Sequence, residues 1–394
     1  EFNGEKGRPD SFVLLDTLLS NQFFRLSFWK VATKEINYRR FFTINGLISL
    51  NMDEEEVFTH THQLVFRLMD QGAISGLRID HIDGLSDPEA YLTRLKKRVP
   101  DAYLVIEKIL EHGEKLPRSL PVHGTTGYDF MNYVNGLFCF KRNERVFSRI
   151  YANFTGFRTN FDQLVREKKR LMVMEHLAGD VNNLAQMMKT IFSRDRHASD
   201  VTMYGLRRAL MEVLDAFPVY RTYVNGEDLT PEDTAYLKQA VDQALETNPA
   251  LEHELTFVRR FLLLRFPPYL DETARKDWVD LVKRFQQITG PLMAKGFEDT
   301  VLYIYNRLIS LNEVGGAPNR FGCTADEFHR YNAQKQCLWP DGMNATATHD
   351  TKRGEDVRAR INVLSEIPHE WERNVKNWAR LNREKKRLVR GMRF

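Results

Sequence analysis

The chain has 394 residues, of which 42% are apolar and 28% are charged, and its formal net charge is +4. This composition is typical of a folded globular protein and excludes a disordered or fibrous one. The small net charge argues against a broad nucleic-acid-binding surface. No stretch reaches the roughly 18 apolar residues of a membrane span, and the first residues lack the pattern of a signal peptide.

Three cysteines are present, Cys139, Cys323 and Cys337, and they cannot all pair within one chain. None has the CxxC or Cys/His spacing of a zinc site, and no acidic cluster has the spacing of a calcium-binding loop. We therefore expect no metal site and a reducing, cytoplasmic location.

The first part of the chain predicts helices followed by a strand–helix–strand unit. Leucines at helical spacing indicate helical structure within residues 11–34, and an amphipathic helix is expected over residues 54–70. Residues 73–110 then read as strand, helix and strand, with Asp80 at the end of the first strand and Glu107 within the second. A right-handed crossover makes the two strands parallel neighbours, so both carboxylates would project from one edge of a sheet.

Glu107 stands in the apolar sequence LVIEKIL, where an unpaired carboxylate is costly unless its pKa shifts or a partner is present. Arg78 lies on the same face of its strand as Asp80 and can hold that aspartate ionised. A glutamate of raised pKa beside an ionised aspartate is the arrangement of a retaining glycosidase or transglycosylase, with Asp80 as nucleophile and Glu107 as general acid. A structural ion pair is the alternative interpretation, because buried Arg–Asp pairs are common in protein scaffolds.

The sequence GTTGYDF at 124–130 predicts a shaped loop, with Tyr128 and Asp129 as candidate sugar contacts. A plain turn that caps the next helix is the alternative. Between residues 134 and 285, long amphipathic segments follow, and their number exceeds what one strand connection needs. We therefore expect an inserted helical subdomain, with helices over residues 161–178, 181–195, 201–217, 231–246 and 251–264.

The last part of the chain contains two further candidate segments. Lys295 and Glu298, in the sequence AKGFEDT, could contact a substrate or each other. After Asp350, residues 351–353 are expected to turn into a helix. His349 is a candidate ligand for a sugar hydroxyl, although a lone histidine is by default a buried structural residue.

Three motifs resemble the active-site strands of the alpha-amylase superfamily (glycoside hydrolase family 13). GLRID at 76–80 resembles its nucleophile strand, VIE at 105–107 its acid/base strand, and ATATHD at 345–350 the strand that ends in its transition-state-stabilising His–Asp pair. The wider sequence around them resembles the maltooligosyl trehalose synthase family over nearly the whole chain. The segments that carry this resemblance are NYRRFFTINGL at 37–47, GLRIDHIDGLSDP at 76–88, EKILEHGEKLP at 107–117, GTTGYDF at 124–130, AKGFEDT at 294–300, NRLISLNEVGG at 306–316 and HDTKRGEDVRARINVLSE at 349–366.

The resemblance implies an α/β fold, a partial TIM (β/α)8 barrel with a large inserted α-helical subdomain. Residues 1–133 would carry the nucleophile and acid/base strands, residues 134–285 the inserted subdomain, and residues 286–394 the later barrel portion with the His–Asp strand. The first signature motif of the superfamily is missing upstream of Asp80, and neither an eighth strand nor a C-terminal β domain follows Asp350. The chain therefore resembles a portion of the family without either end.

The resemblance also implies an isomerase of the glucosylmutase type. It would convert the reducing-end α-1,4 linkage of a maltooligosaccharide into an α,α-1,1 linkage by a retaining double displacement, with Asp80, Glu107 and Asp350 as catalytic residues. The implied substrate contacts are Arg39, Arg78, His81, Tyr128, Asp129, Lys295, Glu298, His349 and Lys352. No cofactor, metal, nucleic acid or membrane is implied, and the oligomeric state is open. The alternatives are an α-glucan hydrolase or glucanotransferase of the same superfamily, and an inactive glucan-binding chain.

Overall fold

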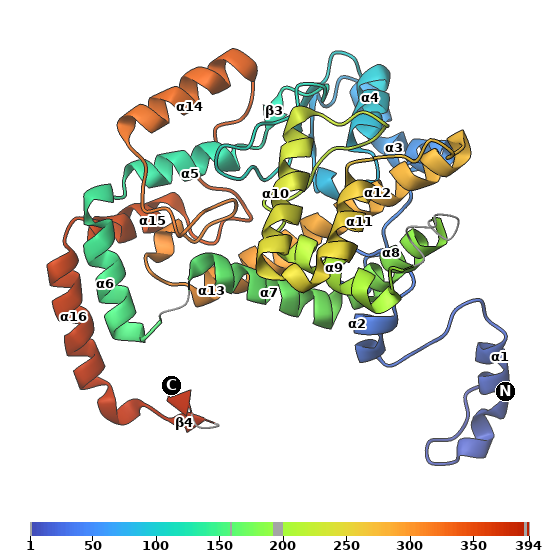
Figure 1. Ribbon diagram of the computed structural model, residues 1–394, viewed down its shortest axis with the longest axis horizontal. Helices are drawn as coiled ribbons and strands as arrows, with labels where there is room; N and C mark the ends of the chain where they lie inside the picture. The colour runs from blue at the N-terminus through green and yellow to red at the C-terminus, as the bar shows by residue number, and fades with distance from the viewer. Residues whose placement is uncertain (1, 158–159, 192–199, 390–391, 394) are drawn as a thin grey trace.

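The computed structural model describes residues 2–157, 160–191, 200–389 and 392–393. Within these residues, one parallel sheet is formed by three strands in the order β1 (Gly76–Ile79), β2 (Tyr103–Ile106) and β3 (Gly124–Thr125) (Figure 1). Ile79 lies opposite Ile106 in the register of β1 and β2. The prediction that these two strands are parallel neighbours is therefore confirmed.

Helix α4 (Pro88–Arg98) connects β1 to β2 and packs against the sheet. Asp87 caps the helix, since its carboxylate accepts a hydrogen bond from a backbone N–H of the first turn. Leu92 and Leu95 are fully buried on the inner face of α4, in one hydrophobic cluster with residues of β2. Burying a leucine contributes roughly 1.5–3 kcal/mol, so this apolar face holds the crossover in place.

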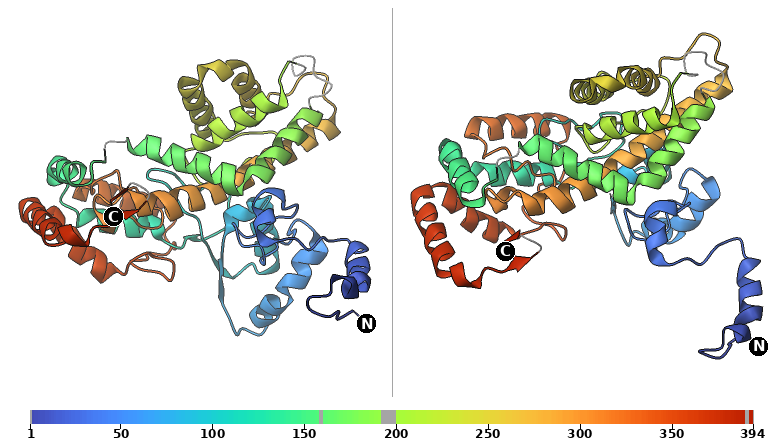
Figure 2. Two further views of the ribbon diagram at one scale, coloured as in Figure 1. Left: turned by 90° about the horizontal axis from the view of Figure 1, so that it is seen from below. Right: turned by 60° about the horizontal axis from the view of Figure 1, so that its bottom comes forward.

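The N-terminal segment carries one long helix and several short helical turns. These elements are η1 (Pro9–Phe12), α1 (Val13–Ser20), η2 (Trp29–Val31), α2 (Ala32–Glu35) and α3 (Glu55–Asp70). The predicted helix over residues 54–70 is confirmed by α3, which packs Phe58 and Phe66 into the cluster beside α4. By contrast, α1 stands apart from the other helices in Figures 1 and 2, and Leu14 and Leu18 are exposed on it. The helical prediction for residues 11–34 is therefore confirmed only in part.

Six helices share one hydrophobic cluster that extends from Val173 to Leu292. They are α7 (Phe161–His176), α8 (Ala178–Ile191), α9 (Met203–Asp215), α10 (Pro231–Thr247), α11 (Glu252–Leu262) and α12 (Glu272–Leu292). Trp278 of α12 is fully buried and stacks on Phe261 of α11, with the ring centroids 5.5 Å apart. The five helices predicted in this region are confirmed to within a few residues, except that the end of the helix predicted over 181–195 lies outside the described residues.

Helix α12 crosses the expected boundary between residues 285 and 286 without interruption and continues into π-helical turns over Met293–Val301. The division of the chain into three parts therefore stays a prediction. The remaining elements are α5 (Tyr128–Leu137), η4 (Lys141–Asn143), α6 (Glu144–Thr155), η7 (Pro249–Leu251), α13 (Leu302–Ile304), η9 (Ile309–Leu311), α14 (Ala325–Leu338), α15 (Glu355–Asn362), η10 (Val363–Ser365), α16 (Pro368–Leu381), η11 (Arg383–Lys385), and the antiparallel pair β4 (Leu388–Val389) and β5 (Met392–Arg393).

Two expectations about strands are wrong. β2 ends at Ile106, so Glu107 follows the strand instead of lying within it, because the paired register with β1 stops there. Residues 346–350 form a loop and not the end of a strand, because the Thr346 carbonyl accepts a hydrogen bond from the Arg358 guanidinium instead of from a neighbouring strand. Within the described part of the chain, the parallel sheet stays open at three strands, and no helix is long and apolar enough to span a membrane.

Candidate active site

Asp80 and Glu107 leave the sheet side by side, each directly after the last residue of its strand. The residues before them, Ile79 and Ile106, are paired in register, and the Glu107 backbone N–H donates to the Ile79 carbonyl at 2.9 Å. The carboxyl ends of parallel strands meet at one edge of a sheet, and ligands of open α/β sheets bind there. The predicted placement of the two carboxyl groups at one sheet edge is therefore confirmed.

His81 turns the chain away from the sheet immediately after Asp80. Its φ of 47° and ψ of 44° lie in the left-handed region, which a non-glycine residue adopts only at a cost. This turn directs the His81 backbone N–H to Glu107 Oε2 at 2.7 Å. The rings of Phe41 and Phe42 pack against the imidazole with centroids 5.1 and 4.6 Å away. Burial lowers the pKa of His81, so the imidazole is neutral at physiological pH.

Arg78 connects the two carboxyl groups. Its Nη1 lies 2.5 Å from Asp80 Oδ1, and its Nη2 lies 3.8 Å from Glu107 Oε1. Partial burial by itself would raise the pKa of Asp80, but the hydrogen bonds from Arg78 and from the Glu107 carboxyl, with the Arg78 charge, bring that pKa below its usual value. Asp80 is therefore ionised near neutral pH, as its position beside Arg78 predicts.

Glu107 has the opposite environment. Burial raises the pKa of Glu107 to about 7, and the neighbouring charge of Asp80 adds to this rise, while the His81 N–H and Arg78 oppose it. The two carboxyl groups are within hydrogen-bonding reach of each other, so the proton held by Glu107 can be shared with ionised Asp80. This close contact is incompatible with the spacing of about 6.5–9.5 Å that inverting glycosidases need.

The loop that contains Asp350 approaches the same sheet edge through Tyr128. Thr348 Oγ1 donates to the Tyr128 hydroxyl at 3.1 Å, and the Asp350 backbone N–H donates to Thr348 Oγ1 at 3.2 Å. Burial raises the pKa of Tyr128, and the negative charges of Asp350 and Glu107 raise it further. Asp350 also pairs with His349, whose Nε2 lies 3.0 Å from Asp350 Oδ2, and both side chains are about half exposed or more.

Lys295 and Lys352 meet at Asp299 instead of at Glu298. Lys295 Nζ lies 2.6 Å from Asp299 Oδ2 and 4.7 Å from the centroid of the Phe42 ring. Lys352 Nζ is 4.0 Å from Asp299 Oδ1. Glu298 is buried and accepts a hydrogen bond from the Gly315 backbone N–H at 2.8 Å. Lys295 and Glu298 thus have different partners and do not form an ion pair with each other. Contact of either residue with a substrate stays a prediction.

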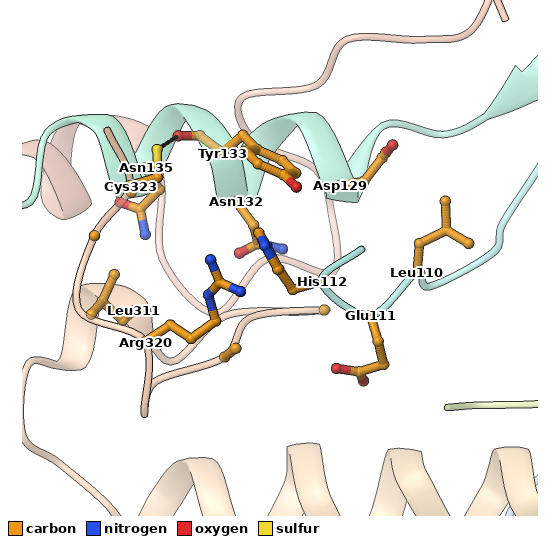
Figure 3. Close-up of a pocket in the computed structure, with 14 residues that line it drawn as sticks. Leu110, Glu111, His112, Asp129, Asn132, Tyr133, Asn135, Leu311, Arg320 and Cys323 are labelled. Carbon is orange, nitrogen blue, oxygen red and sulfur yellow. Dashed lines mark hydrogen bonds between the residues drawn. The ribbon is translucent and has the colours of Figure 1, made fainter. Parts of the chain in front are cut away.

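Asp129 contacts residues of β3 and α14. Its carboxylate accepts hydrogen bonds from the Thr125 hydroxyl at 3.2 Å and from the Tyr331 hydroxyl at 2.6 Å. Asp129 lines a small cavity of about 70 Å³ between α5 and the 311–323 region, whose walls include His112 and Arg320 (Figure 3). Asp129, at the start of α5, therefore connects β3 to α14 through hydrogen bonds.

Arg39, the remaining candidate, is partly buried between the sheet edge and the helical cluster. Burial lowers the pKa of Arg39, and the negative charge of Asp180 on α8 counteracts this effect. Arg39 also acts on His81, where its positive charge contributes to the lowered pKa of the imidazole. Arg39 thus lies on the His81 side of the Asp80 and Glu107 carboxyl groups, as Phe41 and Phe42 do.

Sequence reasoning missed Asp299 and Thr348. The spacing of four residues between Lys295 and Asp299 on a helical segment could have indicated their ion pair. No local signal connects Thr348 to Tyr128, because the contact depends on how two distant segments fold together. Within the described residues, no group of three or more histidine, cysteine, aspartate or glutamate side chains could hold a metal ion.

Comparisons with known proteins give consistent results. No family model matches the chain. A Mycobacterium tuberculosis protein provisionally named maltooligosyl trehalose synthase is 34% identical over 351 residues, which make up 89% of this chain and 42% of that protein. The structure of maltooligosyltrehalose synthase from Arthrobacter ramosus aligns with a TM-score of 0.80 at 33% identity, over 94% of this chain and 44% of that chain. A structure from Sulfolobus tokodaii, described as a hypothetical maltooligosyl trehalose synthase, aligns with a TM-score of 0.73 at 33% identity, over 94% of this chain and 44% of that chain.

The chain thus spans less than half the length of these relatives, and the similarity covers most of its own length. Sequence identity above 30% and the agreement of the folds point to the same family. The resemblance seen in the motifs around Asp80, Glu107 and Asp350 is therefore confirmed: the chain belongs to the maltooligosyl trehalose synthase family.

Proposed function

We propose that this chain carries the catalytic carboxyl groups of a glucosylmutase, which converts the reducing-end α-1,4 linkage of a maltooligosaccharide into an α,α-1,1 linkage. The observation that carries the proposal is the pair of carboxyl groups at one sheet edge. Asp80 has a lowered pKa beside Arg78, while burial raises the pKa of Glu107 to about 7. Two carboxyl groups whose pKa values are separated in this way suit a nucleophile and a general acid.

In the first step, Asp80 attacks the anomeric carbon of the glucosyl residue next to the reducing-end glucose, and Glu107 protonates the oxygen that leaves. The bond from that carbon to the glycosidic oxygen breaks, and a covalent glucosyl–Asp80 ester forms. Because the pKa of Glu107 is about 7, this residue holds a proton near neutral pH and can also release it.

In the second step, the freed glucose turns within the site and presents its own anomeric hydroxyl. Glu107 now accepts the proton of that hydroxyl, the oxygen attacks the anomeric carbon, and the bond to Asp80 breaks. Two inversions retain the configuration and give the α,α-1,1 bond. Attack by water would instead release glucose, so the aromatic residues Phe41 and Phe42 beside His81 are suited to keep water out.

Other residues are proposed as substrate contacts according to their positions. Asp350 and His349 lie on an exposed loop beside Tyr128, where they can bind sugar hydroxyl groups. Lys295 and Lys352, which lie near Asp299, are suited to donate hydrogen bonds to the substrate. For Arg39, Asp129 and Glu298, the observed contacts support structural roles at least as well.

The fold that we propose goes beyond the three parallel strands that the described residues contain. We propose that β1, β2 and β3 are consecutive strands of a (β/α)8 barrel, with the helical cluster of α7–α12 as a subdomain inserted after β3. The parallel β1–α4–β2 crossover and the site at the carboxyl ends of the strands support this arrangement. A cytoplasmic location is likewise a proposal, based on three cysteines that are all free.

The test is incubation of this chain with maltopentaose, with reducing ends and product mass measured together. Loss of reducing ends at unchanged mass is expected for the mutase. Asp80→Asn should abolish the loss. Asp101→Asn, which changes an exposed aspartate before β2 at the opposite sheet edge, is the matched control and should retain activity.

Two other results would contradict the proposal for this chain. The first is hydrolysis, the main competing reaction, because the Asp80 side chain is 57% exposed. Shorter sugars with persisting reducing ends would therefore identify a hydrolase or a glucanotransferase. Unchanged maltopentaose would identify a chain without turnover.

A further inference from the structure

A buried ion cluster connects the two segments that carry Asp80 and Glu107. Lys108 directly follows Glu107, and its Nζ lies 3.2 Å from Asp83 Oδ2 and 3.1 Å from Glu114 Oε1. The Lys108 side chain is fully buried, and the side chains of Asp83 and Glu114 are at most 8% exposed. These three residues are called the Lys108 cluster below.

The helical region of the chain holds the Lys108 cluster from the other side. The Tyr223 hydroxyl donates to the Asp83 carboxylate, and the Lys108 ammonium lies 5.6 Å from the Tyr223 ring centroid. The guanidinium of Arg221, which is buried, donates to the Asp83 carbonyl at 2.7 Å. Buried ion pairs are often replaceable by apolar residues without loss of stability, so a stability role alone does not account for this cluster.

The position of Asp83 links the cluster to the catalytic pair. Asp83 lies in the turn η3 (Ile82–Gly84), which begins directly after His81. The left-handed conformation of His81 is unfavourable for a residue with a side chain, and such conformations persist only where the surroundings hold them. This conformation directs the His81 N–H to Glu107 Oε2. The turn that is anchored by Asp83 is therefore the structure that keeps this hydrogen bond in place.

We propose that Lys108 and Asp83 are positioning residues for the catalytic pair: their buried ion pair fixes the turn after Asp80, so that the His81 backbone N–H stays directed at the Glu107 carboxyl group. Neither side chain reaches the exposed side of the sheet edge, so both act through His81. The proposal rests on the roles proposed for Asp80 and Glu107, but its test needs no turnover.

The test is a carbon-13 NMR titration of the Glu107 carboxyl group, with the His81 amide proton followed in the same samples. Lys108→Met and Asp83→Leu each remove one partner, and charge alone predicts opposite shifts for them. Loss of a cation disfavours the Glu107 carboxylate, whereas loss of an anion favours it. Positioning instead predicts that both variants raise the pKa of Glu107, by about one unit, because both release the N–H that stabilises its charged form. Both should also move the His81 amide proton upfield.

Two further variants separate positioning from unfolding. Tyr223→Phe removes a hydrogen bond to Asp83 without changing any charge. It should also raise the pKa of Glu107, but by less than the charge variants do. This variant keeps the test valid if the charge variants do not fold. Lys169→Met is the matched control, because Lys169 is also a buried lysine but donates to the Phe217 carbonyl at 2.7 Å. It should leave both Glu107 and His81 signals unchanged.

Opposite pKa shifts in Lys108→Met and Asp83→Leu, or an unchanged His81 amide in every variant, would overturn the positioning role. Arg78 and Asp80 also face Glu107, and none of the variants alters them. If the NMR shifts follow the prediction while maltopentaose stays unchanged, the positioning role stands and the proposed function of the chain fails.

Discussion

Replacing Glu107 with glutamine is expected to stabilise the folded chain at alkaline pH and to leave its stability unchanged in acid. Burial raises the pKa of Glu107 from 4.5 to about 7. The folded state therefore favours the protonated carboxyl group. This contribution to stability is fully present below pH 4.5 and is lost as the pH rises through about 7. Glutamine does not titrate, so the variant should not show this loss.

The size of the effect follows from the pKa shift. A rise from 4.5 to about 7 corresponds to about 3 kcal/mol at about 1.4 kcal/mol per unit. The Glu107 side chain is only 20% exposed, so solvent screens little of it. Glutamine can accept the His81 N–H and donate to Asp80, so both contacts are kept. We expect a gain of about 2–3 kcal/mol in the free energy of unfolding at about pH 8, and almost none at about pH 4.

Urea denaturation of both proteins across this pH range measures the difference in the free energy of unfolding. Burial also raises the pKa of Asp215 to about 7 and that of Glu111 to about 8, but their titrations are common to both proteins and cancel in the difference. Glu111→Gln is a control whose gain should begin in the same pH range but level off only above about pH 8, because burial raises the pKa of Glu111 to about 8. An equal difference between wild type and Glu107→Gln at both ends of the range would refute the raised pKa, and with it the general-acid role.

Three further predictions concern the surroundings of the site. Arg78→Met should raise the pKa of Asp80, because burial of that carboxyl group remains while its cationic partner is lost; an unchanged midpoint in a carbon-13 NMR titration would contradict this. Arg221→Met should cost about 3 kcal/mol or more in urea denaturation, because a buried guanidinium that donates to carbonyl groups of the Asp83 turn is removed; a loss below about 1 kcal/mol would argue against this anchor. Gly127→Ala should destabilise more than Gly113→Ala in thermal unfolding. Both glycines have positive φ, but a Cβ at Gly127 would lie 2.6 Å from the Met343 carbonyl oxygen, whereas one at Gly113 meets nothing; equal losses would mean that this contact is unimportant.

The arrangement of Asp80, Glu107 and Arg78 could be predicted from the sequence because it depends on local rules. Alternation within a strand places Arg78 and Asp80 on one face, and a short crossover helix makes consecutive strands parallel neighbours. The amphipathic period likewise predicts α7 to α11 closely, since each helix buries its own apolar stripe.

The prediction fails where a residue depends on a partner far away in the chain. The strand that the family resemblance implies over residues 345–350 is a loop instead, because hydrogen bonds from Arg358 and to Tyr128 hold this segment. The Asp129 carboxylate likewise accepts a hydrogen bond from Tyr331, 202 residues later, and its local sequence gives no sign of this contact.

The sequence by itself determined the family, the helices and the two carboxyl groups at one sheet edge, because periodicity, turn residues and motifs are properties of neighbouring residues. Only the tertiary structure decided which charges are buried and what they pair with. Burial separates the pKa values of Asp80 and Glu107, and the Lys108 cluster forms beneath them, because helices that are remote in the sequence exclude water from that place. Desolvation depends on everything that packs around a group, and no local pattern contains that information.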